Sequence, residues 1–313
     1  MENKKYYAGI QCFDELRRMA IRLASLWGLV HTVLLMAGCQ AEGPKPPTQG
    51  ENDVYYWRTT FSLDSAERAF LTDHRIRRLY CRYFDVVMDG QRGPVPNATV
   101  SFEAEMPDSI EVVPTVFIMN NSLPKDAADS LASLIVRRVM QINESHDIRG
   151  VKELQIDYDY TARNRETYYL FLDKVRAEAR RQGLKLSTTI RLHQLSMPAP
   201  PADYGVLMLY NTGKPERFTE RNPILDMRDV TPYLRHLKGY PLPLAAAYPV
   251  FLWQRDIHGV AVSHEASFDV IMQTKRAVEA ERPELRERIL TYHLNHDNIK
   301  RYQSDQYEEI YRH

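Results

Sequence analysis

The 313-residue sequence has no excess charge of either sign, few glycines and few cysteines. Its 41 basic and 41 acidic residues cancel to a formal net charge of zero, so the chain lacks the positive field that holds a nucleic acid. No strand-like segment is followed by a Gly-x-Gly-x-x-Gly or Gly-x-x-x-x-Gly-Lys loop, which argues against a doubly wound nucleotide-binding sheet. No Gly-x-Ser-x-Gly elbow is present, so serine-nucleophile chemistry is not indicated.

The N-terminus has the layout of a secretory signal. Arg17, Arg18 and Arg22 precede an apolar run over residues 23–37. At roughly 15 residues this run is short for a membrane-spanning helix. A plain signal peptide and an N-terminal membrane helix remain alternatives, and Met19 is an alternative start to Met1.

The apolar run ends in Leu-Met-Ala-Gly-Cys at residues 35–39, which resembles a bacterial lipobox. This resemblance implies a signal peptide over residues 1–38 and lipid attachment at Cys39. No Asp follows within Gln40-Ala41-Glu42, so retention at an inner membrane is not specifically indicated. We therefore expect a protein that is anchored by lipid to the bacterial cell envelope, at the outer membrane.

The remaining cysteines fit this expectation. Cys12 is removed with the signal and Cys39 carries lipid, so Cys81 has no partner for a disulfide within the chain. Residues 39–53 are rich in proline and glycine and have no hydrophobic periodicity, which is typical of a flexible tether.

From residue 54 onward, short apolar or β-branched runs alternate with amphipathic helical segments. The eight predicted strands are Val54–Phe61, Arg78–Met88, Ile110–Met119, Val151–Tyr158, Lys185–Leu192, Gly205–Tyr210, Leu242–Trp253 and Arg288–Leu294. Predicted helices cover residues 126–143, 164–182, a segment from Phe268 and, more weakly, 298–313, whereas 89–108 looks like a loop. This pattern predicts an α/β fold, a (β/α)8 TIM barrel over residues 54–313.

Catalytic and ligand-binding residues of such a barrel lie at the carboxyl ends of its strands. Asp157 and Asp159 follow the fourth strand two residues apart, so both carboxylates are expected to point the same way. We predict that they are catalytic, with Asp159 as the acid because the like charge of Asp157 favours its protonated form. The predicted substrate-binding residues at other strand ends are Arg191, His193, Tyr210, Asn211, Trp253 and Asp297.

A family resemblance rests on two of these strands. Leu-Gln-Ile-Asp-Tyr-Asp at 154–159 and Leu-Ser-Thr-Thr-Ile-Arg at 186–191 resemble an uncharacterised family of bacterial lipoproteins with a TIM-barrel domain, distantly similar to chitinase-type glycoside hydrolases. In those enzymes the motif is Asp-x-Asp-x-Glu, with Glu as the general acid. Asp157 and Asp159 match its aspartates, but Thr161 stands in place of the Glu.

Two hypotheses follow. The first is a lipoprotein enzyme that hydrolyses a glycan, with its second carboxylate from Asp85, Asp89, Asp256 or Asp297. The second is a barrel that binds a saccharide or another polar envelope component without cleaving it, by stacking on Tyr210, Tyr248 and Trp253. A purely structural role also remains open, in which the acid pair forms salt bridges with Arg191 or Arg58.

Metal and cofactor chemistry are not predicted. His293, His296 and Asp297 have the donor types for a divalent ion. On a strand, however, the spacing of the two histidines places them on opposite faces. The expected partners are therefore a glycan or another polar small molecule and a membrane, with no cofactor and no nucleic acid.

Overall fold

The computed structural model describes residues 50–123, 128–213, 221–257 and 260–313. The predicted signal peptide, Cys39 and nearly all of the predicted tether lie outside these residues. Within the described ranges, no helix is both long and apolar enough to cross a lipid bilayer.

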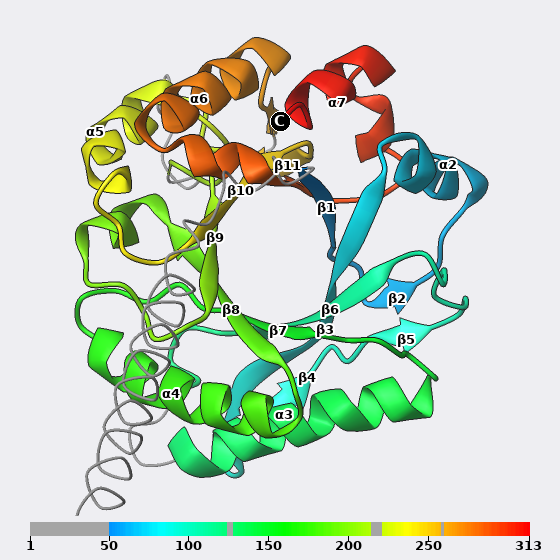
Figure 1. Ribbon diagram of the computed structural model, residues 1–313, viewed down its shortest axis with the longest axis vertical. Helices are drawn as coiled ribbons and strands as arrows, with labels where there is room; N and C mark the ends of the chain where they lie inside the picture. Colours follow the sequence, from blue (N-terminus) through cyan, green and yellow to red (C-terminus); the bar gives the residue numbers. More distant parts are fainter. Residues whose placement is uncertain (1–49, 124–127, 214–220, 258–259) are drawn as a thin grey trace, which may run out of the picture. The chain divides into compact units, whose positions relative to one another are not determined.

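Eight parallel strands of the described residues close into a barrel, which confirms the predicted (β/α)8 fold. Around the ring, and with β13 pairing again with β1, they are β1 (Glu51–Tyr56), β3 (Ile76–Asp89), β6 (Glu111–Ile118), β7 (Glu153–Asp157), β8 (Lys185–Arg191), β9 (Tyr204–Met208), β10 (Leu244–Pro249) and β13 (Arg288–Tyr292). Figure 1 looks along this ring and shows the helices outside it.

The helices cover the outer face of the barrel. They are α2 (Ser65–Asp73), α3 (Ala128–Ser145), α4 (Arg165–Arg181), α5 (Met227–Leu237), α6 (Phe268–Glu281) and α7 (Ser304–Ile310), with 3-10 turns η1 (Leu192–Ser196), η2 (Pro283–Glu287) and η3 (Asn298–Lys300). Helix α4 illustrates the sequence pattern, because Tyr168, Leu172, Val175 and Ala179 form its buried stripe. It is followed closely by Gly183, whose φ of 74° is a left-handed conformation that favours glycine.

The second unit of the barrel departs from the repeat. No helix lies between β3 and β6 in the described residues, as predicted for 89–108. Instead, β4 (Gly93–Asn97) runs antiparallel to the end of β3, and β5 (Ser101–Phe102) pairs with β2 (Thr60–Phe61).

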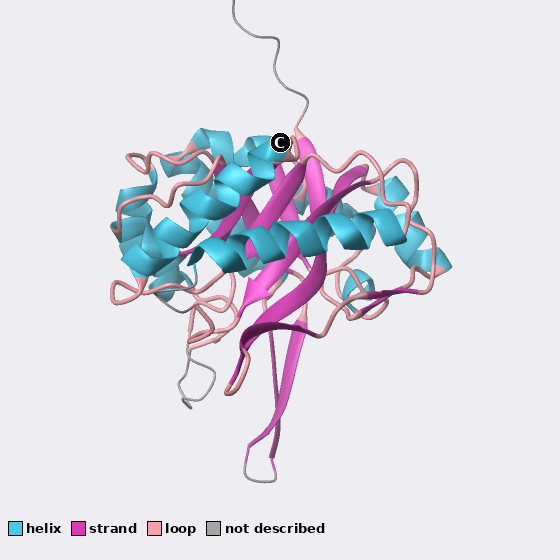
Figure 2. Ribbon diagram, turned by 90° about the horizontal axis from the view of Figure 1, so that it is seen from below, coloured by secondary structure: helices cyan, strands magenta, loops and turns pink. Residues whose placement is uncertain are grey.

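The seventh strand ends earlier than predicted. The segment 242–253 contains barrel strand β10 and the start of a hairpin, formed by β11 (Leu252–Ile257) and β12 (Val260–Glu265). The two strands merge in the sequence because only Val250 and Phe251 separate them, and both are apolar. Trp253 therefore belongs to the hairpin, which projects away from the helices at the carboxyl-end side of the barrel in Figure 2.

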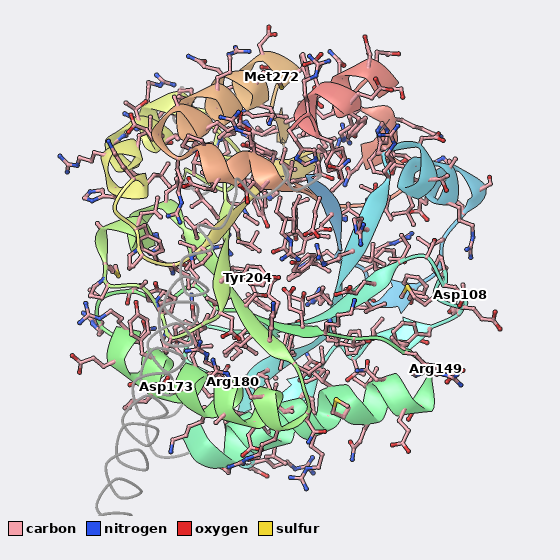
Figure 3. All side chains as sticks on the ribbon, viewed as in Figure 1. Asp108, Arg149, Asp173, Arg180, Tyr204 and Met272 are labelled. Atoms are coloured by element: carbon pink, nitrogen blue, oxygen red, sulfur yellow. The ribbon has the colours of Figure 1, made fainter. Side chains whose placement is uncertain are left out.

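The interior at the amino ends of the strands is ionic. Arg288 Nε lies 2.7 Å from Asp53 Oδ2, and its NH2 group lies 3.2 Å from Glu153 Oε2. Tyr204, labelled in Figure 3, points into the barrel and shares a 2.9 Å hydrogen bond with Tyr80. The predicted tether over residues 39–53 extends too far toward the barrel. Strand β1 already begins at Glu51, and Asp53 is fully buried.

Candidate ligand-binding site

A cavity of about 440 Å³ opens at the carboxyl ends of β7, β8 and β9. Its volume lies within the ~300–1,000 Å³ of typical small-molecule sites. It brings together five residues predicted to form the site: Asp159, Arg191, His193, Tyr210 and Asn211. The other lining residues are Leu192, Met208, Thr212 and Tyr233. Barrel closure thus gathers side chains that are separated by more than fifty residues in the sequence.

The alternation Asp-Tyr-Asp-Tyr explains why the carboxylates of Asp157 and Asp159 face the barrel mouth. Tyr158 and Tyr160 point the other way and pack on Tyr168 of α4, with ring centroids 4.8 and 5.1 Å apart. Both tyrosines are buried. Side chains therefore continue to alternate between the two faces of the strand beyond Asp157, the last residue of β7.

Asp157 is enclosed behind the cavity. Its Oδ1 accepts a 2.7 Å hydrogen bond from the Thr189 hydroxyl and lies 3.6 Å from an Arg191 guanidinium nitrogen. Burial raises the pKa of Asp157 despite the opposing effect of Arg191. Its carboxylate is thus tied to β8, which makes Asp157 a group that positions Arg191.

Asp159 is the acid that reaches the cavity, and 46% of its side chain is exposed. Its Oδ1 is nevertheless buried and has no hydrogen-bond partner among the described residues. His193 Nε2 lies 3.8 Å from this oxygen, which is too long for a hydrogen bond.

Two more polar atoms at the cavity have no hydrogen-bond partner among the described residues. Arg191 Nε is one of them, and the other is the hydroxyl of Tyr210, which is 3% exposed. Burial raises the pKa of Tyr210 well above its ordinary value, so its hydroxyl keeps its proton and can donate. Buried polar groups are normally satisfied, so these atoms and Asp159 Oδ1 mark a place for ligand hydrogen bonds.

An aromatic cluster supports Tyr210. Its ring stacks on Tyr292 at the end of β13, with centroids 4.7 Å apart and planes at 25°. Tyr55, Trp57 and Phe251 surround Tyr292 at 5.5–5.6 Å. The ring of Tyr210 is therefore held in place, and its hydroxyl is fixed toward Arg191.

Three other residues of the binding hypothesis lie elsewhere. Trp253 packs against His264 within the hairpin, 5.7 Å between centroids. Asp297 is exposed at the start of η3, and neither residue lines the cavity. Tyr248 is fully buried and lies near Glu279 of α6, so it faces the helices instead of the barrel mouth.

Thr212, Tyr233 and Met208 line the cavity but were not among the predicted site residues. Met208 is the last residue of β9 and is apolar, so the pattern of polar strand ends does not include it. Tyr233 is contributed by helix α5 and has no strand-end signal. Thr212 follows Tyr210 by two residues, a spacing that would have found it if the loop had been included.

The candidate second carboxylates do not line this cavity. Asp85 forms an ion pair with Arg82, and Asp89 accepts hydrogen bonds from the backbone of Gln91 and Arg92. Asp256 belongs to β11. Of the predicted ion pairs, Arg191 does approach Asp157, whereas Arg58 pairs with Glu67 at 2.9 Å.

Thr161 is exposed and turned toward the start of α4. Its backbone nitrogen donates to Asn164 Oδ1 at 2.7 Å, and its hydroxyl lies 3.3 Å from the same oxygen. Asn164 in turn donates to the Tyr158 hydroxyl at 2.8 Å. The position where the resembling enzymes have a general acid therefore serves a loop contact in this chain.

The histidines at the last strand end are separated in the structure. His293 is largely buried, and burial lowers its pKa to about 4. His296 is exposed, and its Nδ1 lies 2.6 Å from Asp64 Oδ2. In the described part of the chain, no group of three His, Cys, Asp or Glu side chains is arranged to hold a metal ion.

The fold and site define a (β/α)8 barrel with a polar cavity at the carboxyl ends of its fourth, fifth and sixth strands. No family model matches the sequence, and no curated protein matches it. Solved structures do match in fold, and they include chitinases and a spore cortex-lytic enzyme.

One is the spore cortex-lytic enzyme SleL of Bacillus cereus, with TM-score 0.53, 13% identity and coverage of 85% of this chain and 74% of that one. Another is a chitinase of Chromobacterium violaceum, with TM-score 0.54, 13% identity and coverage of 83% and 98%. A GH18 chitinase of Pseudoalteromonas aurantia has TM-score 0.50 and 12% identity, with coverage of 83% and 98%. At these identities the likeness concerns the fold.

Proposed function

We propose that this chain binds a glycan, or another ligand rich in hydroxyl groups, in the cavity of Asp159, Arg191 and Tyr210 without hydrolysing it. The observation that carries the proposal is the set of three polar atoms at this cavity that have no hydrogen-bond partner among the described residues: Asp159 Oδ1, Arg191 Nε and the Tyr210 hydroxyl. Sugar hydroxyls both donate and accept, so they match one carboxylate acceptor and two donors.

The described residues that line the cavity include no second carboxylate, which argues for binding over hydrolysis. Glycoside hydrolysis generally uses two carboxyl groups, about 5–5.5 Å or 6.5–9.5 Å apart, across the scissile bond. Substrate-assisted enzymes such as GH18 chitinases are an exception to this pair, and for them the argument rests on the missing general acid. Asp159 is the one carboxylate among the described residues that line the cavity. Asp157 is enclosed by Thr189 and Arg191, and Thr161 replaces the acid of the resembling enzymes. The fold neighbours, chitinases and a cortex-lytic enzyme, support a glycan as the ligand class.

The proposal is tested by titrating the full chain in neutral-detergent micelles against a panel of glycan oligomers. We expect at least one oligomer to bind and no oligomer to be cleaved. Asp159→Asn should weaken that binding by about tenfold, because it replaces a charge-assisted acceptor with a neutral amide. Asp173→Asn is the matched control, since Asp173 lies on the outer side of α4 (Figure 3) and should leave the affinity unchanged.

Two results would contradict it. Release of product by the unmodified chain, lost in Asp159→Asn, would restore the hydrolase hypothesis. Equal weakening by Asp159→Asn and Asp173→Asn would remove the cavity as the binding place.

For location, we propose lipid anchoring at Cys39 to the outer membrane of the bacterial envelope. Cys39 is the last residue of the lipobox-like segment. We expect Cys39→Ala to abolish incorporation of labelled palmitate and to remove the chain from the lipid-modified membrane fraction. Cys81→Ala is the control and should remain labelled, because Cys81 is fully buried. Labelling that persists in Cys39→Ala would contradict the proposal.

A further inference from the structure

An apolar groove is lined by residues of β3, β4 and α3. Figure 1 shows α3 beside β4 on the outside of the barrel, next to the unit that has no helix among the described residues. Its volume is about 340 Å³. The floor is formed by Phe84 and Val86, which are two residues apart on β3 and therefore point to the same outer face. This groove is separate from the cavity at the barrel mouth, with which it shares no residue.

Both walls of the groove are apolar. Helix α3 contributes Leu131, Leu134 and Ile135, and β4 contributes Pro94 and Pro96. Leu134 is half exposed, which is unusual for a leucine beside a concave apolar surface. An apolar group that enters such a groove displaces water favourably, because apolar surface is removed from water.

The shape of the groove limits what can occupy it. Strand β4 is an open sheet edge, but Pro94 and Pro96 cannot donate backbone hydrogen bonds, so an added peptide strand would pair poorly. An α-helix is about 10 Å across, so a volume of about 340 Å³ would hold only a small part of one. A single flexible chain fits better than either.

The groove becomes cationic toward the C-terminal half of α3. Arg137 and Arg138 follow Leu134 by three and four residues and line the same groove. Neither has an ion pair with another residue in the described part of the chain. The groove therefore combines apolar walls with two guanidinium groups that have no ion pair among the described residues.

We propose that this groove binds a fatty acid, with its acyl chain along Leu131, Leu134 and Ile135 and its carboxylate between Arg137 and Arg138. Charge complementarity identifies the anionic head, because arginine forks match carboxylates in geometry as well as charge. The volume favours one acyl chain over the two chains of a phospholipid. This site does not depend on glycan binding at the barrel mouth.

The test uses a hexadecanoate probe with a diazirine on its acyl chain, photolysed with the full chain in neutral-detergent micelles. Mass spectrometry of the peptides should place the label on residues 84–96 and 131–141. We expect Leu134→Asp to lower labelling by about tenfold, since a charge would enter the apolar wall. Leu170→Asp is the matched control, because Leu170 is 63% exposed on α4 and outside the groove. Its labelling should be unchanged.

The headgroup is tested separately. The double substitution Arg137→Gln and Arg138→Gln should lower labelling by about tenfold. A probe with the same chain and a trimethylammonium head should label the unmodified groove weakly. Equal labelling by the two heads, or label spread over Leu170 and other exposed apolar residues, would overturn the proposal. Cross-links between two copies of the chain at this groove would also overturn it and assign the surface to self-association.

Discussion

Replacing Arg288 with methionine should lower the free energy of unfolding by about 3–5 kcal/mol, because a buried ion network would lose its central cation. Arg288 contacts Asp53 and Glu153, hydrogen-bonds to the Tyr80 hydroxyl and lies over the ring of Tyr204. Asp53 is fully buried, and Glu153 is nearly so. Both carboxylates would be left in a poorly solvated interior. Thermal unfolding followed by circular dichroism should show a melting temperature lower by about 10 °C.

The control for this experiment is Arg149→Met. Arg149 pairs with Asp147 at 2.7 Å, but its side chain is 83% exposed, so water and salt screen the pair. Its melting temperature should equal that of the unmodified chain. If Arg288→Met melts at the same temperature as the unmodified chain, the buried ion network around Arg288 does not stabilise the fold.

The barrel was predictable because its strands and helices differ in hydrophobic period. Hydrophobic period is a local property, so two boundaries were predicted wrongly: the end of the tether and the end of the seventh strand. Asp53 was assigned to the tether because polar residues near prolines and glycines look like a linker. In the structure, Asp53 faces Arg288 from the other end of the chain, a pairing that no local pattern can reveal. Likewise, the seventh strand and the hairpin were read as one element, since hydrophobicity alone does not mark the change of partner at 250–251.

The cavity was partly predictable from the rule that function lies at the carboxyl ends of barrel strands. It located Asp159, Arg191 and Tyr210, which the structure brings to one cavity. It did not separate the roles of Asp157 and Asp159, because their difference depends on Thr189 and Arg191 in the next strand. Tyr233 was missed because it comes from a helix. Sequence order thus predicts which edge carries the site, while cross-strand contacts decide what each side chain does.

Arg191 connects the cavity to the barrel, so Arg191→Met should affect both ligand binding and stability. It removes a donor from the cavity, and we expect glycan affinity to fall by about 30-fold. It also leaves the buried Asp157 carboxylate with the Thr189 hydroxyl as its hydrogen-bond partner among the described residues. Because Arg191 lowers the pKa of Asp157 more than Thr189 or Arg82 does, that pKa should rise further above its ordinary value in the variant.

A raised folded-state pKa for an acid means that the folded chain binds more protons than the unfolded chain above about pH 4. The free energy of unfolding therefore falls as the pH rises through the folded-state pKa of Asp157. The loss of stability caused by Arg191→Met should be larger at pH 7 than at pH 5. Urea unfolding at the two pH values measures this difference. Adding Asp157→Leu removes the stranded charge, so the double variant should recover stability at pH 7 but not glycan affinity. Recovery of glycan affinity would show that Arg191 acts only by neutralising Asp157. A loss of stability that is the same at both pH values would show that Asp157 is not the group left unpaired.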